Sequence, residues 1–129
     1  MLIIPMFDNE KEMLLESFDK NDSLYIDNDE EPYFSTLRFF LNGSPSDLWV
    51  DKFTSDYSNF FPKDDSYSIE FDGNKLIVRD HYVELESLQE YVNQLKLLFS
   101  STNQYFKDKE DNNKSKELRF NNIVDNLEI

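Results

Sequence analysis

The chain has 129 residues, a length typical of one domain, with 16% aromatic residues and a net charge of −14. The aromatic content argues against a disordered chain, because disordered segments lack the bulky apolar groups that offset the entropy lost on ordering. The acidic balance excludes ordinary binding to nucleic acids or to anionic membranes, since both require a basic surface. The chain has no cysteine, which excludes disulfides and thiolate chemistry.

The N-terminal stretch MLIIPMF is apolar, but it lacks the basic residues and the length of a signal peptide. No run elsewhere approaches the roughly 20 apolar residues that a membrane-spanning helix needs. We therefore expect a cytoplasmic protein.

The N-terminal third predicts a strand over 2–7 and a helix over 9–19. The helix prediction rests on the capping-box pattern NEKE at its start and on apolar residues at helical spacing after it. An acidic loop follows, with a short strand at 24–26. The run YFSTLRFFL at 33–41 is rich in aromatic and β-branched residues and predicts a longer strand. Simple alternation places four of its side chains on one face: Tyr33, Leu37, Phe39 and Leu41.

The middle of the chain contains the clearest local signal. GSPS at 43–46 predicts a loop, and DLWVDKF at 47–53 fits either a strand or a short helix. The segments SYSIEF and KLIVRD flank Asp-Gly-Asn at 72–74, which predicts a β-hairpin. HYVE at 81–84 extends or follows the second strand of that hairpin.

The C-terminal third predicts a helix over 87–106, because its apolar residues recur at steps of three and four. Residues 107–117 contain no apolar side chain, and apolar residues then return. The chain therefore divides into a single α+β domain over 1–106, a polar linker or loop over 107–117 and a C-terminal docking segment over 118–129. Within the domain we expect an antiparallel sheet of four to five strands with helices packed against one face.

The acidic stretch DKNDSLYIDNDE resembles a 12-residue calcium loop. Two residues argue against that interpretation: Leu24 stands where the loop needs glycine, and Pro32 falls in the expected exit helix. We therefore predict no metal site and no cofactor. Oxygen-bearing side chains do occupy the ligand positions: Asp19, Asn21, Ser23, Asp27 and Glu30.

The sequence offers little for catalysis. His81 is the single histidine, and its place at the end of a predicted hairpin favours a surface or edge position. We find no nucleophile elbow, no phosphate-binding loop, no dinucleotide-binding motif and no cysteine–histidine metal spacing. The sequence therefore predicts a protein that is not an enzyme.

Acids and aromatics are interleaved in the first two thirds of the chain. Residues 1–86 hold 20 acids and 7 bases, whereas residues 87–129 hold 7 acids and 6 bases. Carboxylates complement Lys and Arg on a basic partner, and Tyr and Trp are favoured anchors at protein interfaces. We therefore predict that a basic protein binds the following residues: Asp27, Asp29, Glu30, Glu31, Tyr33, Asp47, Trp49, Asp51, Asp56, Tyr57, Asp64 and Asp65.

The hairpin SYSIEFDGNKLIVRD, followed by the helical stretch ELESLQEYVNQLKLLF, resembles immunity proteins of bacterial polymorphic toxin and contact-dependent growth-inhibition systems. The resemblance covers roughly residues 66–100. It implies a protein that binds one cognate toxin domain and blocks it, with no catalytic residues of its own. The net negative charge further indicates that this toxin is basic, most simply a nuclease.

Three other functions stay open at this point. A phage-type inhibitor that mimics nucleic acid would use the same charge against a host defence enzyme. A small acidic secretion chaperone would form a homodimer and bind an unfolded client. A small enzyme is the fourth possibility, disfavoured by the missing motifs.

Overall fold

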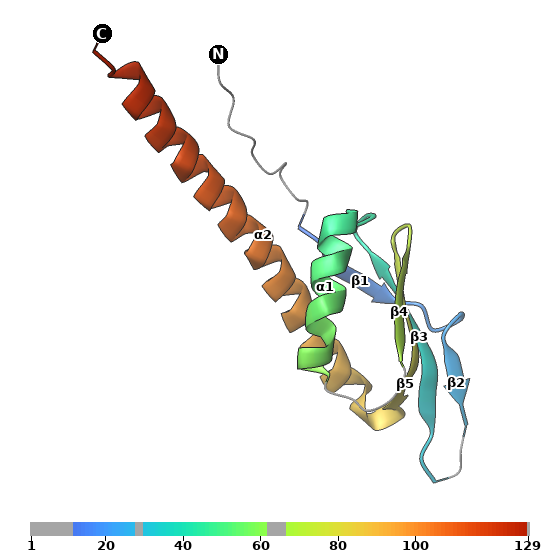
Figure 1. The fold of residues 1–129 in the computed structure, drawn as a ribbon. Helices are drawn as coiled ribbons and strands as arrows, with labels where there is room; N and C mark the ends of the chain where they lie inside the picture. Colours follow the sequence, from blue (N-terminus) through green and yellow to red (C-terminus); the bar gives the residue numbers. More distant parts are fainter. Residues whose placement is uncertain (1–11, 28–29, 62–66, 129) are drawn as a thin grey trace.

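The computed structural model describes residues 12–27, 30–61 and 67–128. The fold is α+β, as predicted: an antiparallel sheet of five strands carries two helices on one face, and the second helix projects beyond it (Figure 1). The predicted strand at 2–7 lies outside the described residues. The elements in chain order are β1 (Leu15–Phe18), β2 (Leu24–Ile26), β3 (Tyr33–Leu41), α1 (Asp47–Phe60), β4 (Ser68–Asp72), β5 (Lys75–Glu84), a 3₁₀ turn η1 (Leu85–Ser87) and α2 (Leu88–Asp125).

Strand β3 lies at the centre of the sheet. Its one edge pairs with β5, and its other edge pairs with both β1 and β2, each over part of its length. Strand β4 completes the sheet as the hairpin partner of β5, which confirms the predicted hairpin. Its turn consists of Gly73 and Asn74, and Gly73 has a φ of 58°, a left-handed conformation that glycine adopts without steric strain.

The predicted helix over 9–19 is wrong for the described residues, since β1 occupies Leu15–Phe18. Tertiary hydrogen bonds explain why the chain is extended here. The backbone N–H of Leu14 donates to the side-chain oxygen of Asn42, and the backbone N–H of Asn42 donates to the carbonyl of Leu14. Such non-local pairing overrides a weak local helical preference.

Strand β3 has the predicted bounds, but its buried face differs from simple alternation. Leu37, Phe39 and Leu41 are buried as expected, whereas Phe34 takes the inward place predicted for Tyr33. The cause is an extra residue in β3 itself: the adjacent residues Leu24 and Tyr25 of β2 pair with Thr36 and Phe34, which leaves Ser35 without a counterpart in β2. Strand β5 also bulges here, because Phe34 pairs with Val83 and Thr36 pairs with Arg79, so β5 carries two extra residues across that interval.

Helix α1 resolves the ambiguity at 47–53 in favour of a helix that continues to Phe60. The Ser46 hydroxyl caps it by accepting from the backbone N–H of Trp49 at 3.2 Å. Trp49, Phe53 and Tyr57 follow at steps of four and are all buried against the sheet and α2. The indole N–H of Trp49 donates to Asn103 of α2 at 2.9 Å, so the two helices are tied together through the core.

Helix α2 runs without interruption for 38 residues, so the polar linker predicted at 107–117 is wrong. A lack of apolar side chains does not prevent a helix here, because six of the eleven residues are Lys or Glu, which favour helices, and Glu110 pairs with Lys114 at a spacing of four. Residues 121–128 are exposed, so the predicted docking segment does not dock on this domain. In the part of the chain that is described, no helix combines the length and apolar character needed to cross a membrane.

Candidate protein-binding surface

The fold joins two acidic segments at one end of the sheet. Residues 24–37 contain four acids and residues 80–95 contain four, and neither segment contains Lys or Arg. Strand pairing places Tyr33 opposite Glu84, and the backbone N–H of Leu85 donates to the carbonyl of Pro32 at 3.0 Å. We call the resulting surface the acidic end, which lies at the bottom of Figure 1. Its exposed acids are Asp27, Glu30, Glu31, Asp80, Glu84, Glu86 and Glu90.

Two tyrosines give the acidic end an aromatic component. The rings of Tyr33 and Tyr82 pack edge to face with centroids 5.5 Å apart, and Tyr82 is 52% exposed. The bulge in β5 orients them. Asp80 and Tyr82 have φ angles of 62° and 54°, in the left-handed region that non-glycine residues rarely occupy. Each such residue stores about 1–3 kcal/mol of strain, and strain of this kind clusters at functional sites.

The same bulge turns His81 inward, where it is only 8% exposed. The prediction that His81 lies at the surface or at an edge is therefore wrong. Its Nδ1 is 2.5 Å from the Tyr57 hydroxyl, which is 2.9 Å from the Tyr91 hydroxyl. Burial raises the pKa of both Tyr57 and Tyr91 well above the usual 10, so both phenols keep their protons and continue to support this chain of hydrogen bonds.

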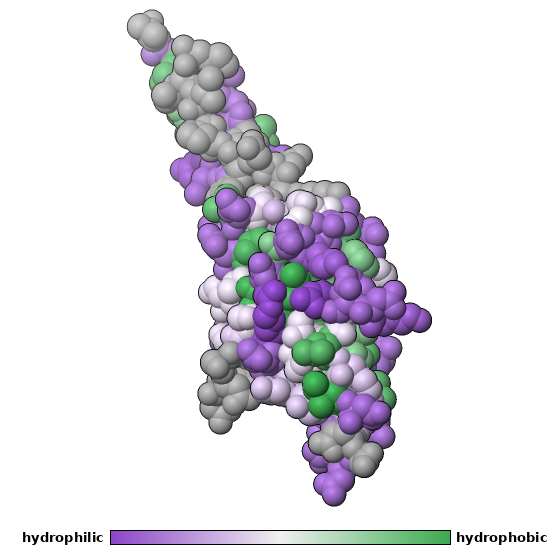
Figure 2. Space-filling model, turned by 90° about the vertical axis from the view of Figure 1, so that its right-hand side faces the viewer, coloured by the Kyte–Doolittle hydropathy of each residue, from purple (hydrophilic) through white to green (hydrophobic). Residues whose placement is uncertain are grey.

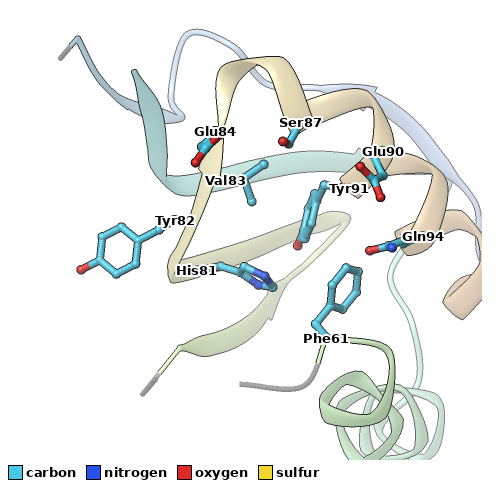
Figure 3. Close-up of a pocket in the computed structure, with 9 residues that line it drawn as sticks. All are labelled: Phe61, His81, Tyr82, Val83, Glu84, Ser87, Glu90, Tyr91 and Gln94. Carbon is cyan, nitrogen blue, oxygen red and sulfur yellow. The ribbon is translucent and has the colours of Figure 1, made fainter. Parts of the chain in front are cut away.

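A pocket of about 280 Å³ opens beside this network, within the acidic end. Figure 3 shows that β5, the turn η1 and the start of α2 contribute to it, together with Phe61, the residue that follows α1. Aromatic rings form its inner wall, and polar and acidic side chains surround its mouth. The lining residues are Phe61, His81, Tyr82, Val83, Glu84, Ser87, Glu90, Tyr91 and Gln94.

Two of the sequence-predicted anchors are wrong. Trp49 and Tyr57 are both 0% exposed, so neither can contact a partner. The reason is the helical spacing of α1, which directs both side chains into the core instead of toward solvent. Tyr33 is half-buried and remains accessible at the acidic end.

The predicted acids do not form one surface. Asp27, Glu30 and Glu31 belong to the acidic end, whereas Asp47 and Asp51 lie at the start of α1, near the opposite end of β3. A nine-residue strand separates the two groups by roughly 26 Å.

The remaining predicted acids are Asp29, Asp56, Asp64 and Asp65. Asp56 forms an ion pair with Lys52 at 3.0 Å within α1. Asp29, Asp64 and Asp65 lie outside the described residues.

Sequence reasoning missed several residues of this surface: Tyr82, Glu84, Glu86 and Glu90. One signal was available, because residues 80–95 contain no Lys or Arg. That signal gains meaning only when β3 pairs with β5 and brings the segment beside the loop between β2 and β3.

The face of the sheet opposite the helices also carries charges, but they are paired within the chain. Lys75 contacts Asp19 at 3.1 Å and Asp22 at 3.7 Å, and Arg79 contacts Glu70 at 2.5 Å. Figure 2, drawn from this side, shows a mostly hydrophilic surface with small apolar areas. We call it the open face.

The Asp19 carboxyl of the open face is held in its ionised form. Burial opposes ionisation, but the hydrogen bond from Lys75 and those from backbone N–H groups outweigh it and lower the pKa of Asp19. The segment that resembles a calcium loop contains β2 and an aspartate bonded to lysine. In residues 12–27, 30–61 and 67–128, no three His, Cys, Asp or Glu side chains form a group that could hold a metal ion.

Comparison of the chain with protein-family models, with curated proteins and with solved structures finds no match. The functional interpretation therefore depends on the geometry and charge of the surface itself.

Proposed function

We propose that the protein is an immunity-type inhibitor that binds a basic toxin domain, most simply a nuclease, in the cytoplasm. One observation carries this proposal: two acidic segments without any Lys or Arg are joined by strand pairing into a single exposed surface. Like charges held together repel one another and lower the stability of the folded protein. Binding to a partner of opposite charge is a reason for the chain to keep such a surface.

The acidic end has the composition of an interface that captures its partner quickly. Exposed acids raise the rate of association with a basic protein, up to about 10⁸–10⁹ M⁻¹s⁻¹ at low salt. Tyr33 and Tyr82 supply aromatic contact area beside those acids. A cell that makes its own toxin needs such rapid capture, which favours an inhibitor over a slow-binding chaperone.

The proposal can be tested by capturing partners from the source cells on the immobilised protein, after nuclease treatment, at low and high salt. We expect recovery of a basic protein domain whose binding weakens as salt rises. Recovery of a host nucleic-acid enzyme instead would support the mimic that competes with this proposal. Recovery of no basic protein at either salt concentration would overturn both.

Two matched variants locate the interface on the molecule. Glu84→Gln with Glu86→Gln removes two charges from the acidic end, and Asp47→Asn with Asp51→Asn removes two from the start of α1. We expect the first pair to slow association with the captured partner several-fold and the second pair to leave it nearly unchanged. Equal effects would mean that net charge alone drives binding.

Inhibition requires a separate measurement. Expression of the captured domain alone should arrest growth of a host strain, and co-expression of this protein should restore it. Restoration by the Asp47/Asp51 variant but not by the Glu84/Glu86 variant would link protection to the acidic end. A captured domain that is harmless alone would contradict the immunity function.

A further inference from the structure

We propose that the pocket in the acidic end receives an arginine side chain from the partner. This inference rests on the proposed function and names the chemistry that the surface recognises. The second acidic segment, residues 80–95, supplies every lining residue of the pocket except Phe61, and the pocket combines acidic side chains with an aromatic wall.

The size of the pocket favours a side chain over a separate metabolite. Its volume of about 280 Å³ falls just below the roughly 300–1,000 Å³ of pockets that hold drug-sized ligands. It is also open to the surface that we assign to the partner, as Glu84 and Glu90 at its mouth are both exposed. A long side chain on the surface of the partner can enter such a pocket while the partner's backbone stays outside it.

The aromatic wall is held in place by its own packing. Phe61, His81 and Tyr91 contact one another with ring centroids 5.0–5.3 Å apart, and each is more than nine-tenths buried. The hydroxyl of Tyr57 bonds both His81 and Tyr91 from behind. A wall fixed in this way loses little conformational entropy when a ligand binds to it.

The mouth supplies hydrogen-bond acceptors. In the described part of the chain, Glu84 and Glu90 make no ion pair, so both carboxylates remain available to a cation. Glu90 and Gln94 of α2 lie on the side that faces the pocket, and Ser87 of η1 lines it as well (Figure 3). Together they offer two carboxylate oxygens, a hydroxyl oxygen and an amide oxygen.

Arginine fits this combination better than lysine. Its guanidinium is flat, stacks on aromatic rings and presents five N–H donors in a fixed fork that matches a carboxylate. A lysine ammonium is a compact and strongly hydrated charge, so it gains less from the aromatic wall. The pocket therefore selects for shape as well as for charge.

The test is an NMR titration of the whole protein with N-acetyl-arginine amide, compared with N-acetyl-lysine amide, which has the same charge. His81 is the only histidine, so its imidazole signals report directly on the pocket wall. We expect saturable shifts of His81 with the arginine probe and clearly weaker binding of the lysine probe. Glu90→Gln should weaken arginine binding at least about tenfold, because it removes a charge-assisted hydrogen bond.

Glu86→Gln is the matched control, since Glu86 is an exposed acid of the same surface that does not line the pocket. We expect it to change arginine binding by less than about twofold, as an exposed charge acts only through a screened field. Absence of saturable shifts, equal affinity for the two probes, or equal losses in both variants would each overturn the inference. The titration uses no protein partner, so it can fail while capture succeeds, and the reverse also holds.

Discussion

The open face and the acidic end both carry charged side chains, but they differ in whether bases accompany the acids. On the open face, Lys75 and Arg79 are matched with acids of the same chain at distances of 2.5–3.7 Å. At the acidic end, the contributing segments supply acids and no base at all. The chain has bases available, so their absence from these two segments is a property of the segments and not of the overall composition.

This difference separates charges that support the fold from charges that face a partner. Paired charges on the open face link β5 to β4 and to the residue that follows β1, and removing one partner is expected to lower stability modestly. The acids at the acidic end repel one another and lower the stability of the fold, a cost that is common at functional sites. Measurements of stability alone, without any partner, therefore distinguish the two surfaces.

The largest effect is expected beneath the acidic end, at the hydroxyl of Tyr57. Tyr57→Phe removes the group that bonds both His81 and Tyr91 in a buried site. We expect a loss of about 1–3 kcal/mol in the free energy of unfolding, measured by urea denaturation. Tyr91→Phe is the control, because it removes only the last hydroxyl of this hydrogen-bond network and keeps the bond between Tyr57 and His81. A Tyr57 variant as stable as the wild type would mean that the network does not support the acidic end.

A smaller loss is expected on the open face from Asp19→Asn, which removes the carboxylate that pairs with Lys75. The pKa of Asp19 is lowered in the folded protein, so its contribution is present above the unfolded value near 3.8. That contribution disappears as the pH falls through the folded pKa. The variant should therefore melt below the wild type at pH 6, and the difference should close as the pH falls below about 3.8. A difference that persists at low pH would assign the effect to packing instead of charge.

Sequence reasoning succeeded where local chemistry and alternation decide the structure. The hairpin around Gly73 and the strand Tyr33–Leu41 follow from turn residues and β-rich runs. It failed where a distant contact decides, as at Leu15–Phe18, which becomes a strand through its pairing with β3. It also failed at residues 107–117, where the lack of apolar side chains predicts a linker although the residues form a helix.

The candidate surface divides in the same way. Asp27, Glu30 and Glu31 were found because a dense acidic run is visible in the sequence. Glu84 and Glu90 were missed, since only the pairing of β3 with β5 brings them to the same surface. Trp49 and Tyr57 were misplaced because the residues around them show no clear period, although the step of four that buries them is present.

The smallest effects give the most direct comparison of the two surfaces. Glu70→Gln breaks an exposed ion pair with Arg79 and should lower the free energy of unfolding by up to about 1 kcal/mol. Glu84→Gln removes an equal charge from a segment that contains acids and no Lys or Arg, so stability should stay within about 0.5 kcal/mol or rise slightly. Thermal melts at low and high salt would measure both, and the effect of each variant should shrink as salt screens the charges. A Glu84 variant that is clearly less stable than the Glu70 variant would mean that this glutamate supports the fold, and the acidic end would then lose its interpretation as a surface kept for a partner.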